Sequence, residues 1–162
     1  DVRPVHLAVP PGSPPASPGS PPGHPRHSFG APMFEPTIDA DSRPYWDGIA
    51  RGELLLQHCL NCSRAIFYPR AVCPLCFSTD LEWRAASGTG TVYSYTVMRK
   101  AFGRFATDPP TVVALVDLDE GVRMMTHLVG LDPSDARIGA RVEVTVKAVE
   151  EDLSLPCFTP VA

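Results

Sequence analysis

The sequence predicts a mostly β protein with a short helix at its start, a small metal-held ribbon next and a small β-barrel at its end. Three observations support this fold class. Of the 19 prolines, 11 fall within the first 36 of the 162 residues, so the remaining 126 residues form the folded body. The body holds two C-x-x-C pairs, after which short runs of β-branched and aromatic residues alternate with turns. A body of this size buries only a small core, so a stabilising staple is expected.

Residues 1–36 are predicted to be a disordered, proline-rich linker. Residues 10–27 read PPGSPPASPGSPPGHPRH and offer almost no side chain whose burial could offset the entropy of ordering. Such segments favour extended polyproline II geometry and act as semi-rigid spacers. The alternative is a ligand for a proline-reading module, because residues 11–14 and 15–18 fit P-x-x-P. Since a spacer separates two bodies and the chain opens at Asp1 rather than Met, we expect another domain to precede it in a longer polypeptide.

Residues 37–52 are predicted to form a short helical segment. Tyr45, Trp46 and Ile49 recur at helical spacing. The boundaries come from residues that suit helix ends: Asp41 or Ser42 as the cap, Pro44 in the first turn and Gly52 as the stop. Two adjacent large aromatic side chains on so short a helix need a partner surface. We expect Tyr45 and Trp46 to pack on the body's own strands, with docking onto another protein as the alternative.

Four cysteines carry the strongest signal, and they define a predicted zinc ribbon over residues 53–83. They form two pairs, Cys59 with Cys62 and Cys73 with Cys76, and ten residues separate the pairs. Two residues between thiolates let both sulfurs turn toward one point, so two such turns facing each other make a tetrahedral four-sulfur site. Residues 54–58 are the expected partner strand, and residues 63–72 are long enough for a strand and its return. Four thiolates close the coordination sphere, so the zinc would be structural and would serve as the staple.

Alternatives to a four-sulfur zinc site stay open for these cysteines. Iron in a rubredoxin-like site uses the same four ligands. Structural disulfides are an alternative, although nothing in the sequence indicates secretion. A thioredoxin-like redox pair needs one C-x-x-C in a βαβ setting, which the sequence lacks. His58, next to Cys59, is a substitute ligand, and the isolated Cys157 is expected to be a small core residue rather than a nucleophile.

Residues 84–162 are predicted to form a small Greek-key barrel of the OB type, with a small sandwich as the competing architecture. Residues 111–118 are nearly all apolar and are expected to be buried on both faces, whereas residues 141–147 alternate strictly between apolar and polar. The sequence Asp119-Glu120-Gly121 predicts a tight turn inside a hairpin. The expected strands cover residues 81–84, 91–99, 111–118, 122–129, 141–147 and 155–158, with a polar loop or one helical turn at 132–137.

Charge argues against a nucleic-acid partner for this barrel. The chain has a net charge of −4, and from Arg84 onward 8 Lys and Arg stand against 10 Asp and Glu. This balance disfavours a groove that follows phosphates. One loop, after the strand at 91–99, combines basic and aromatic residues that could contact an anionic, adenine-bearing ligand; the alternative is a solvated loop with two phenylalanines tucked beneath it. Its residues are Arg99, Lys100, Phe102, Arg104 and Phe105.

No catalytic residue is predicted. The sequence shows no Ser/His/Asp order, phosphate-binding loop or paired carboxylates. Asp117 and Asp119 share a strand face, but Asp119 is expected to begin the turn. His127 lies within an apolar run, where a core or partner-facing role is expected rather than a general base. The sequence also lacks an apolar run of membrane-spanning length and a secretory signal, so we expect no membrane partner and a cytoplasmic location.

The order of the motifs resembles that of a known family. The motifs are Tyr45-Trp46, the run 52–56 (GELLL), the two C-x-x-C pairs with Pro69-Arg70 before the second, the run 87–96 (SGTGTVYSYT), the run 116–123 (VDLDEGVR) and Ile138-Gly139. Residues 37–160 therefore resemble the acyl-CoA-associated family once catalogued as domain of unknown function 35. In that family a rubredoxin-like zinc ribbon is joined to an OB fold.

The resemblance implies an accessory role. Members of the family accompany thiolase-fold enzymes that act on acyl-CoA thioesters, or are fused to hotdog-fold enoyl-CoA hydratases. Their partners include acyltransferases and the retro-aldolases of steroid side-chain breakdown. The resemblance also assigns the structural zinc to Cys59, Cys62, Cys73 and Cys76, and it fits a head that tethers this unit to a hydratase domain.

The leading hypothesis is a non-catalytic domain that binds and supports a thiolase-fold acyl-CoA enzyme, foremost a retro-aldolase that cleaves a C–C bond of a steroid-type acyl-CoA thioester. The CoA thioester would be bound jointly with the partner. The candidate contacts to CoA or partner are Arg99, Lys100, Phe102, Arg104, Phe105, Tyr45 and Trp46. The alternatives are an accessory subunit of an acetyl-CoA acyltransferase, a single-stranded nucleic-acid-binding module and a rubredoxin-like electron carrier.

Overall fold

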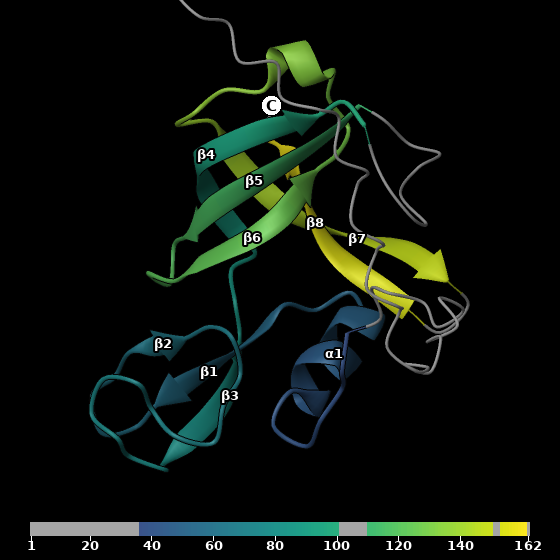
Figure 1. The fold of residues 1–162 in the computed structure, drawn as a ribbon. Coiled ribbons are helices and arrows are strands. Elements are labelled where there is room, and N and C mark those ends of the chain that lie inside the picture. The colour runs from purple at the N-terminus through teal and green to yellow at the C-terminus, as the bar shows by residue number, and fades with distance from the viewer. Residues whose placement is uncertain (1–35, 101–109, 151–152, 162) are drawn as a thin grey trace, which may run out of the picture. The chain divides into compact units, whose positions relative to one another are not determined.

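The computed structural model describes residues 36–100, 110–150 and 153–161 (Figure 1). The predicted linker over residues 1–36 therefore lies almost wholly outside the described residues. The described residues all belong to one compact unit, Phe34–Ala162. Within them, no helix has the length and apolar character needed to cross a bilayer.

The first element is helix α1, Arg43–Ala50, where the sequence predicts it. Pro44 lies in the first turn, where a missing amide is no loss, and Gly52 follows the helix with a φ of +82°, which glycine adopts without strain. Ser42 is the N-cap, but its side chain makes no capping bond to the helix. Its hydroxyl instead donates to Asp39 Oδ1 at 2.6 Å, and its amide donates to the same oxygen. These bonds hold the pKa of Asp39 below its ordinary value.

Three antiparallel strands form the ribbon: β1 (Leu55–Cys59), β2 (Ala65–Ile66) and β3 (Leu81–Ala85). Strand β1 is central, in the order β2-β1-β3. Strand β3 pairs with β1 along its whole length. The strand expected at residues 81–84 therefore completes the sheet of the ribbon.

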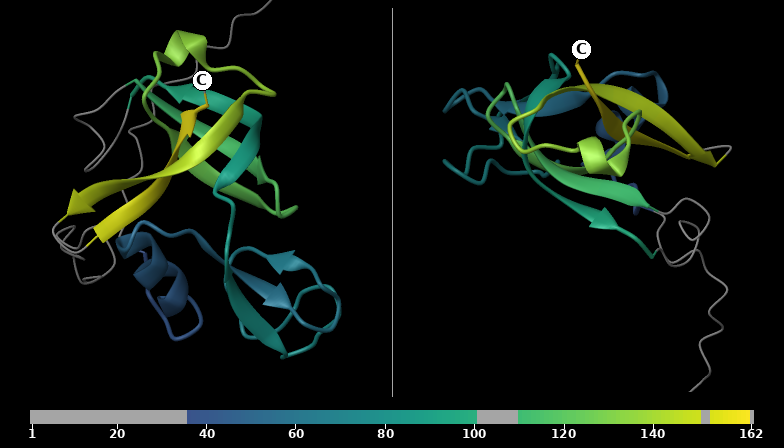
Figure 2. Two further views of the ribbon diagram at one scale, coloured as in Figure 1. Left: turned by 180° about the vertical axis from the view of Figure 1, so that it is seen from behind. Right: turned by 90° about the horizontal axis from the view of Figure 1, so that it is seen from above.

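Five strands form a closed barrel in the order β4-β5-β6-β8-β7. This confirms the predicted OB-type barrel over the alternative sandwich. Strands β7 and β8 pair over most of their length and run side by side in both views of Figure 2, whereas β6 and β8 pair in parallel at only two positions. The strands are β4 (Thr89–Met98), β5 (Thr111–Leu118), β6 (Arg123–Leu128), β7 (Arg141–Glu150) and β8 (Leu153–Pro160), and one short 3-10 turn, η2 (Pro133–Asp135), follows β6.

Strand β5 is buried on one face only, so the prediction of burial on both faces is wrong. Its residues alternate between buried and partly exposed positions along the whole strand. A closed barrel has a single interior, so alternate residues face outward even when they are apolar. The inward side chains join those of α1 and β1 in one core, which includes Tyr45, Ile49, Leu54, Leu56, Val92, Val116, Met124, Val142 and Phe158.

The turn between β5 and β6 fastens the segment that enters the barrel. Glu120 Oε1 accepts a hydrogen bond from the Ser87 amide at 2.6 Å, and Asp119 Oδ2 accepts one from the Thr89 hydroxyl at 2.6 Å. Arg141 of β7 donates to both oxygens of Asp119, at 2.8 and 2.7 Å. The guanidinium holds the pKa of Asp119 well below its ordinary range. The predicted turn thus forms hydrogen bonds with Ser87, Thr89 and Arg141, all of which are distant from it in the sequence.

Gly90 brings the backbone of β4 into direct contact with β5. A Cβ at this position would lie 2.7 Å from the Asp117 carbonyl oxygen and 2.7 Å from Val116 Cγ1. We expect Gly90→Ala to lower the free energy of unfolding by about 1–3 kcal/mol, because the strands must move apart, as measured by urea unfolding. Ser94→Ala, at a partly exposed position of the same strand, is the control and should change it by less than about 0.5 kcal/mol. An unchanged urea midpoint for Gly90→Ala would contradict this close approach.

Candidate metal centre

Two turns of the same design hold the four cysteines. In the first turn the Ser63 amide donates a hydrogen bond to the Cys59 carbonyl at 2.8 Å, and in the second the Phe77 amide donates one to the Cys73 carbonyl at 3.0 Å. Each bond spans four residues. The amide of the first cysteine donates to the carbonyl five residues further on, at 3.0 and 2.9 Å respectively. The two C-x-x-C pairs therefore form equivalent knuckles.

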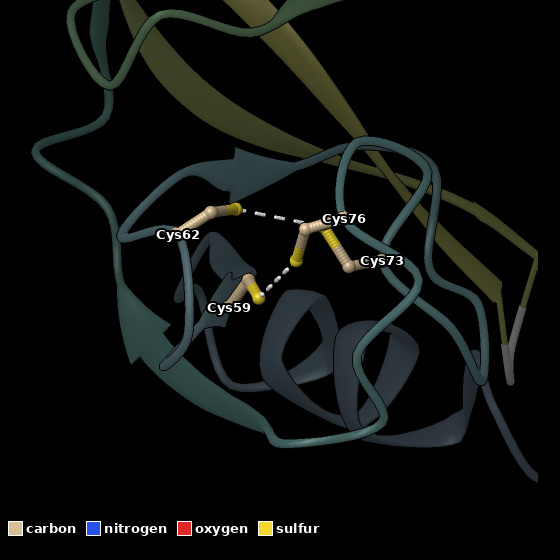
Figure 3. Close-up of side chains that lie close together, drawn as sticks. All are labelled: Cys59, Cys62, Cys73 and Cys76. Carbon is tan, nitrogen blue, oxygen red and sulfur yellow. Dashed lines mark hydrogen bonds between the residues drawn. The ribbon is translucent and has the colours of Figure 1, made fainter.

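The four sulfur atoms converge on one point (Figure 3). All lie within 4.8 Å of one another, with 3.4 Å between Cys59 Sγ and Cys76 Sγ and 3.7 Å between Cys62 Sγ and Cys73 Sγ. A zinc ion with four tetrahedral bonds of about 2.3 Å places its sulfur ligands about 3.8 Å apart. The cluster therefore fits a zinc ion in both donor type and size. Cys59 and Cys73 are buried, whereas Cys62 and Cys76 are partly exposed.

The two partly exposed thiols differ in pKa. Desolvation raises the pKa of Cys62 to about 12, although a backbone hydrogen bond from Arg64 acts in the other direction. Hydrogen bonds from the Asn61 side chain and the Ser78 backbone lower the pKa of Cys76 to about 6. Arg64 and Ser78 occupy equivalent positions, two residues after the second cysteine of each pair. A bound divalent cation favours the thiolate at every ligand, and these backbone donors stabilise that charge.

The structure bears on the alternatives for these cysteines. All five cysteines lie in the described residues, and none forms a disulfide. The separations of 3.4 and 3.7 Å far exceed an S–S bond of about 2.05 Å. His58 lies in β1, opposite Glu82 of β3, and does not belong to the sulfur cluster. Iron uses the same four sulfurs, so elemental analysis decides between the two metals.

Known protein families match both the ribbon and the barrel of this chain. A family model described as the rubredoxin-like zinc ribbon domain of ChsH2 matches residues 46–82, and one described as the C-terminal OB-fold domain of ChsH2 matches residues 83–147. A DUF35 domain-containing scaffold protein of Methanothermobacter thermautotrophicus is 37% identical over 95 residues, which cover 58% of this chain and 71% of that protein. The chain belongs to the DUF35 family. The resemblance read from the motifs is thereby confirmed.

Longer relatives of this DUF35 chain carry hydratase names. The probable enoyl-CoA hydratase alpha subunit of Thermomonospora curvata is 37% identical over 125 residues, covering 77% of this chain and 39% of the relative. The 3-oxo-4,17-pregnadiene-20-carboxyl-CoA hydratase alpha subunit of Mycobacterium tuberculosis is 34% identical over 121 residues, covering 70% of this chain and 36% of the relative. This chain thus spans well under half the length of these two relatives.

Two solved structures share the fold of the DUF35 chain. A chain of the Ltp2-ChsH2(DUF35) aldolase is 36% identical with a TM-score of 0.71, and the match covers 78% of this chain and 98% of that chain. A DUF35 protein of unknown function from Sulfolobus solfataricus is 15% identical with a TM-score of 0.54, over 75% of this chain and 86% of that chain. The second match shows the fold alone.

The predicted contact residues Tyr45 and Trp46 lie at an aromatic cavity. Tyr45 is 2% exposed, and its ring packs edge-on against Trp46 with 5.0 Å between centroids; burial raises the pKa of its hydroxyl. Trp46 is partly exposed, and its Nε1 donates to the Tyr68 hydroxyl at 2.9 Å. Tyr45 belongs to the core that the barrel strands form, and Trp46 packs against it, so packing on the body's own strands is confirmed and a contact with a partner stays a prediction. The cavity, of about 300 Å³, is lined by Tyr45, Trp46, Phe67, Tyr68, Met124, Met125, Thr126, His127, Leu155 and Pro156.

The structure describes only two members of the predicted basic loop. Arg99 and Lys100 are exposed at the end of β4, and Phe102, Arg104 and Phe105 lie outside the described residues. Arg99 helps to line a pocket of about 190 Å³ near η2. Contact of this loop with CoA or a partner stays a prediction.

Two carboxylates of the barrel, Asp117 and Asp119, are held in ion pairs that were not predicted from the sequence. Arg123 donates to both oxygens of Asp117, at 2.6 and 3.0 Å, and this pairing lowers the pKa of Asp117. The same guanidinium lies 3.3 Å from the centroid of the Tyr93 ring. The pairing of Asp117 with Arg123 could have been predicted from the hairpin, because a turn at residues 119–121 places these two residues opposite each other. Cys157 is buried, as expected. The pKa of His127 is lowered, first by burial and then by the nearby charge of Lys147.

We expect one tightly bound metal ion per chain, identified as zinc by elemental analysis. Cys73→Ser removes one of the four ligands and should abolish stoichiometric binding. It should also lower the free energy of unfolding by about 3 kcal/mol or more. Cys157→Ala removes the one cysteine outside the cluster and should keep the metal. A parent protein without metal after growth in zinc- and iron-supplemented medium would contradict the assignment, and a red iron-containing protein would contradict zinc.

Proposed function

We propose that this DUF35 chain is a non-catalytic accessory domain of an acyl-CoA enzyme system. Its proposed partner is a thiolase-fold retro-aldolase that acts on a steroid-type acyl-CoA thioester. In such a reaction a 3-hydroxyacyl-CoA is cleaved between C2 and C3 to give a ketone and a shorter acyl-CoA. Residues of the partner supply this chemistry, and the DUF35 chain stabilises the partner and helps to shape its substrate channel.

The observation that carries the proposal is the likeness to the Ltp2-ChsH2(DUF35) aldolase. The match reaches 36% identity and covers 98% of the related chain. It therefore concerns the whole unit of ribbon and barrel rather than one of its parts. The relatives named as DUF35 domain-containing scaffold proteins, in Methanocaldococcus jannaschii and Methanothermobacter thermautotrophicus, support a structural rather than a catalytic role.

A hydratase domain is part of the same proposal. The relatives named as hydratase alpha subunits are more than twice as long as the part that this chain matches, which covers 39% and 36% of them. An enoyl-CoA hydratase adds water to a double bond and yields the 3-hydroxyacyl-CoA that a retro-aldolase consumes. The proposal therefore includes a hotdog-fold hydratase domain joined to this unit through residues 1–36.

A structural zinc ion completes the proposed domain. The size of the sulfur cluster and the match of residues 46–82 to a zinc ribbon support it. Cys59, Cys62, Cys73 and Cys76 would hold the ion and leave no coordination position for water or substrate. The ion would therefore hold the two knuckles together and take no part in the reaction.

The CoA thioester is proposed to be bound jointly with the partner. The guanidinium of Arg99 and the ammonium of Lys100 are exposed cations, and such groups suit the phosphates of CoA. Arg99→Ala should therefore raise the KM of the complex for its acyl-CoA without dissociating the complex.

Co-expression with thiolase-fold enzymes of the same organism tests the proposal. We expect a complex of fixed stoichiometry in size-exclusion chromatography. We also expect faster cleavage of a steroid-type 3-hydroxyacyl-CoA by the complex than by the partner alone, and none by this chain alone. If no thiolase-fold enzyme is bound or activated, the proposal is wrong. Tight, salt-sensitive binding of single-stranded DNA would favour the nucleic-acid hypothesis instead.

A further inference from the structure

Three large apolar side chains are exposed on the two knuckles. Leu60 lies inside the first C-x-x-C pair, Leu75 lies inside the second, and Phe77 follows the second directly. Their exposed fractions are 56%, 60% and 79%. Each is the chain neighbour of a cysteine whose sulfur belongs to the cluster, so all three residues lie at the end of the ribbon that holds the sulfur cluster. We call Leu60, Leu75 and Phe77 the knuckle patch.

Phe77 occupies a backbone position that suits glycine. Its φ is +60°, in the left-handed region where the Cβ of a bulky residue causes strain. Glycine adopts this conformation freely. The equivalent residue of the first knuckle, Ser63, has a φ of +58° and a small polar side chain. On backbone conformation alone, glycine would therefore be more favourable than phenylalanine at position 77.

Neither the ribbon core nor the sulfur cluster accounts for the ring of Phe77. The core beneath the knuckles consists of the four cysteines, Ile66 and Leu81, and it does not include Phe77. The amide of Phe77 donates to the Cys73 carbonyl at 3.0 Å, but every residue except proline supplies an amide. A strained backbone that carries an exposed aromatic ring points to a contact outside the chain.

The size and charge of the knuckle patch favour another protein over a second copy or a lipid surface. Three such side chains expose on the order of 350 Å². A stable interface buries roughly 800 Å² per partner, so a symmetric dimer through the patch alone would not hold. Residues 60–63 and 74–79 include no Lys or Arg, whereas membrane-binding surfaces combine apolar with basic side chains. The patch has the character of an apolar anchor inside a larger protein interface.

We propose that the knuckle patch inserts Phe77 into an apolar pocket of the thiolase-fold partner, with Leu60 and Leu75 packed around the entrance of that pocket. This inference rests on the proposed function and names the surface through which the domain acts. The hydrogen-bonded knuckles hold the backbone of Phe77 in place, so little backbone entropy is lost when the partner binds.

The variant Phe77→Gly separates binding from folding. It removes the ring and relieves the strained φ, so we expect an equal or higher Tm, full metal content and an affinity for the purified partner lower by about tenfold or more, measured by calorimetric titration. Leu75→Ser should weaken binding in the same assay. Ser63→Gly relieves the equivalent strain without removing an apolar side chain and should bind as the parent does. Ile138→Ser removes a side chain of similar exposure, 68%, from the barrel and should also bind normally.

Different outcomes would overturn this inference and the proposed function. If the parent binds and both Phe77→Gly and Leu75→Ser bind equally well, the inference fails while the proposed function stands. If the parent binds no thiolase-fold enzyme, the proposed function fails and the inference fails with it. Self-association of the parent that Phe77→Gly abolishes would assign the patch to a second copy, and binding to anionic vesicles would assign it to lipid. Either result would also overturn the inference.

Discussion

The two knuckles of the ribbon depend on the convergence of four sulfur atoms, because the cluster beneath them contains little else. This cluster consists of Cys59, Ile66 and Cys73, with Cys62, Cys76 and Leu81 packed against them, so four of its six members are the clustered cysteines. Strand β2 has only two residues, and a sheet with so short a strand has little stability of its own. Metal–sulfur bonds would thus replace the apolar core that a segment of this size cannot build. The positions of Leu60, Leu75 and Phe77 depend on the same bonds.

Strand β1 connects this metal-dependent part to the apolar core of the barrel. Leu56, with Leu54 just before the strand, joins the core that also contains Tyr45 and Ile49. Successive residues of a strand face opposite sides, and Gln57 accordingly turns toward the ribbon, where its Oε1 accepts a hydrogen bond from the Arg70 amide at 2.8 Å. One short strand therefore serves two cores of different chemistry.

Features that a few neighbouring residues determine were predictable from the sequence, whereas features that depend on pairing between distant segments were not. The spacing within each cysteine pair, the turn at Asp119 and the alternation of residues 141–147 each lie within a few residues. The structure confirms the sulfur cluster and the turn, and it packs Val142, Val144 and Val146 in or against the core, as the alternation predicts. The one-sided burial of β5 was not predictable, because an apolar run does not reveal how many faces of a strand are covered. The pairing of Asp119 with Arg141 depends on how β7 lies beside β4. Phe77 was not singled out from the sequence, because its positive φ is visible only in the structure.

The barrel closes through a short seam. Strands β6 and β8 pair only at His127 with Cys157 and at Leu128 with Phe158. Just before these pairs, Pro156 has no amide to offer β6, and its carbonyl accepts a hydrogen bond from the Thr126 hydroxyl at 2.9 Å. Local opening of a structure begins where few bonds must break, and this seam has the fewest paired residues of the strand pairs in the barrel. The protein therefore has two unlike weak points: the thiolates of the ribbon, on which chelators and oxidants act, and the short pairing of β6 with β8 in the barrel.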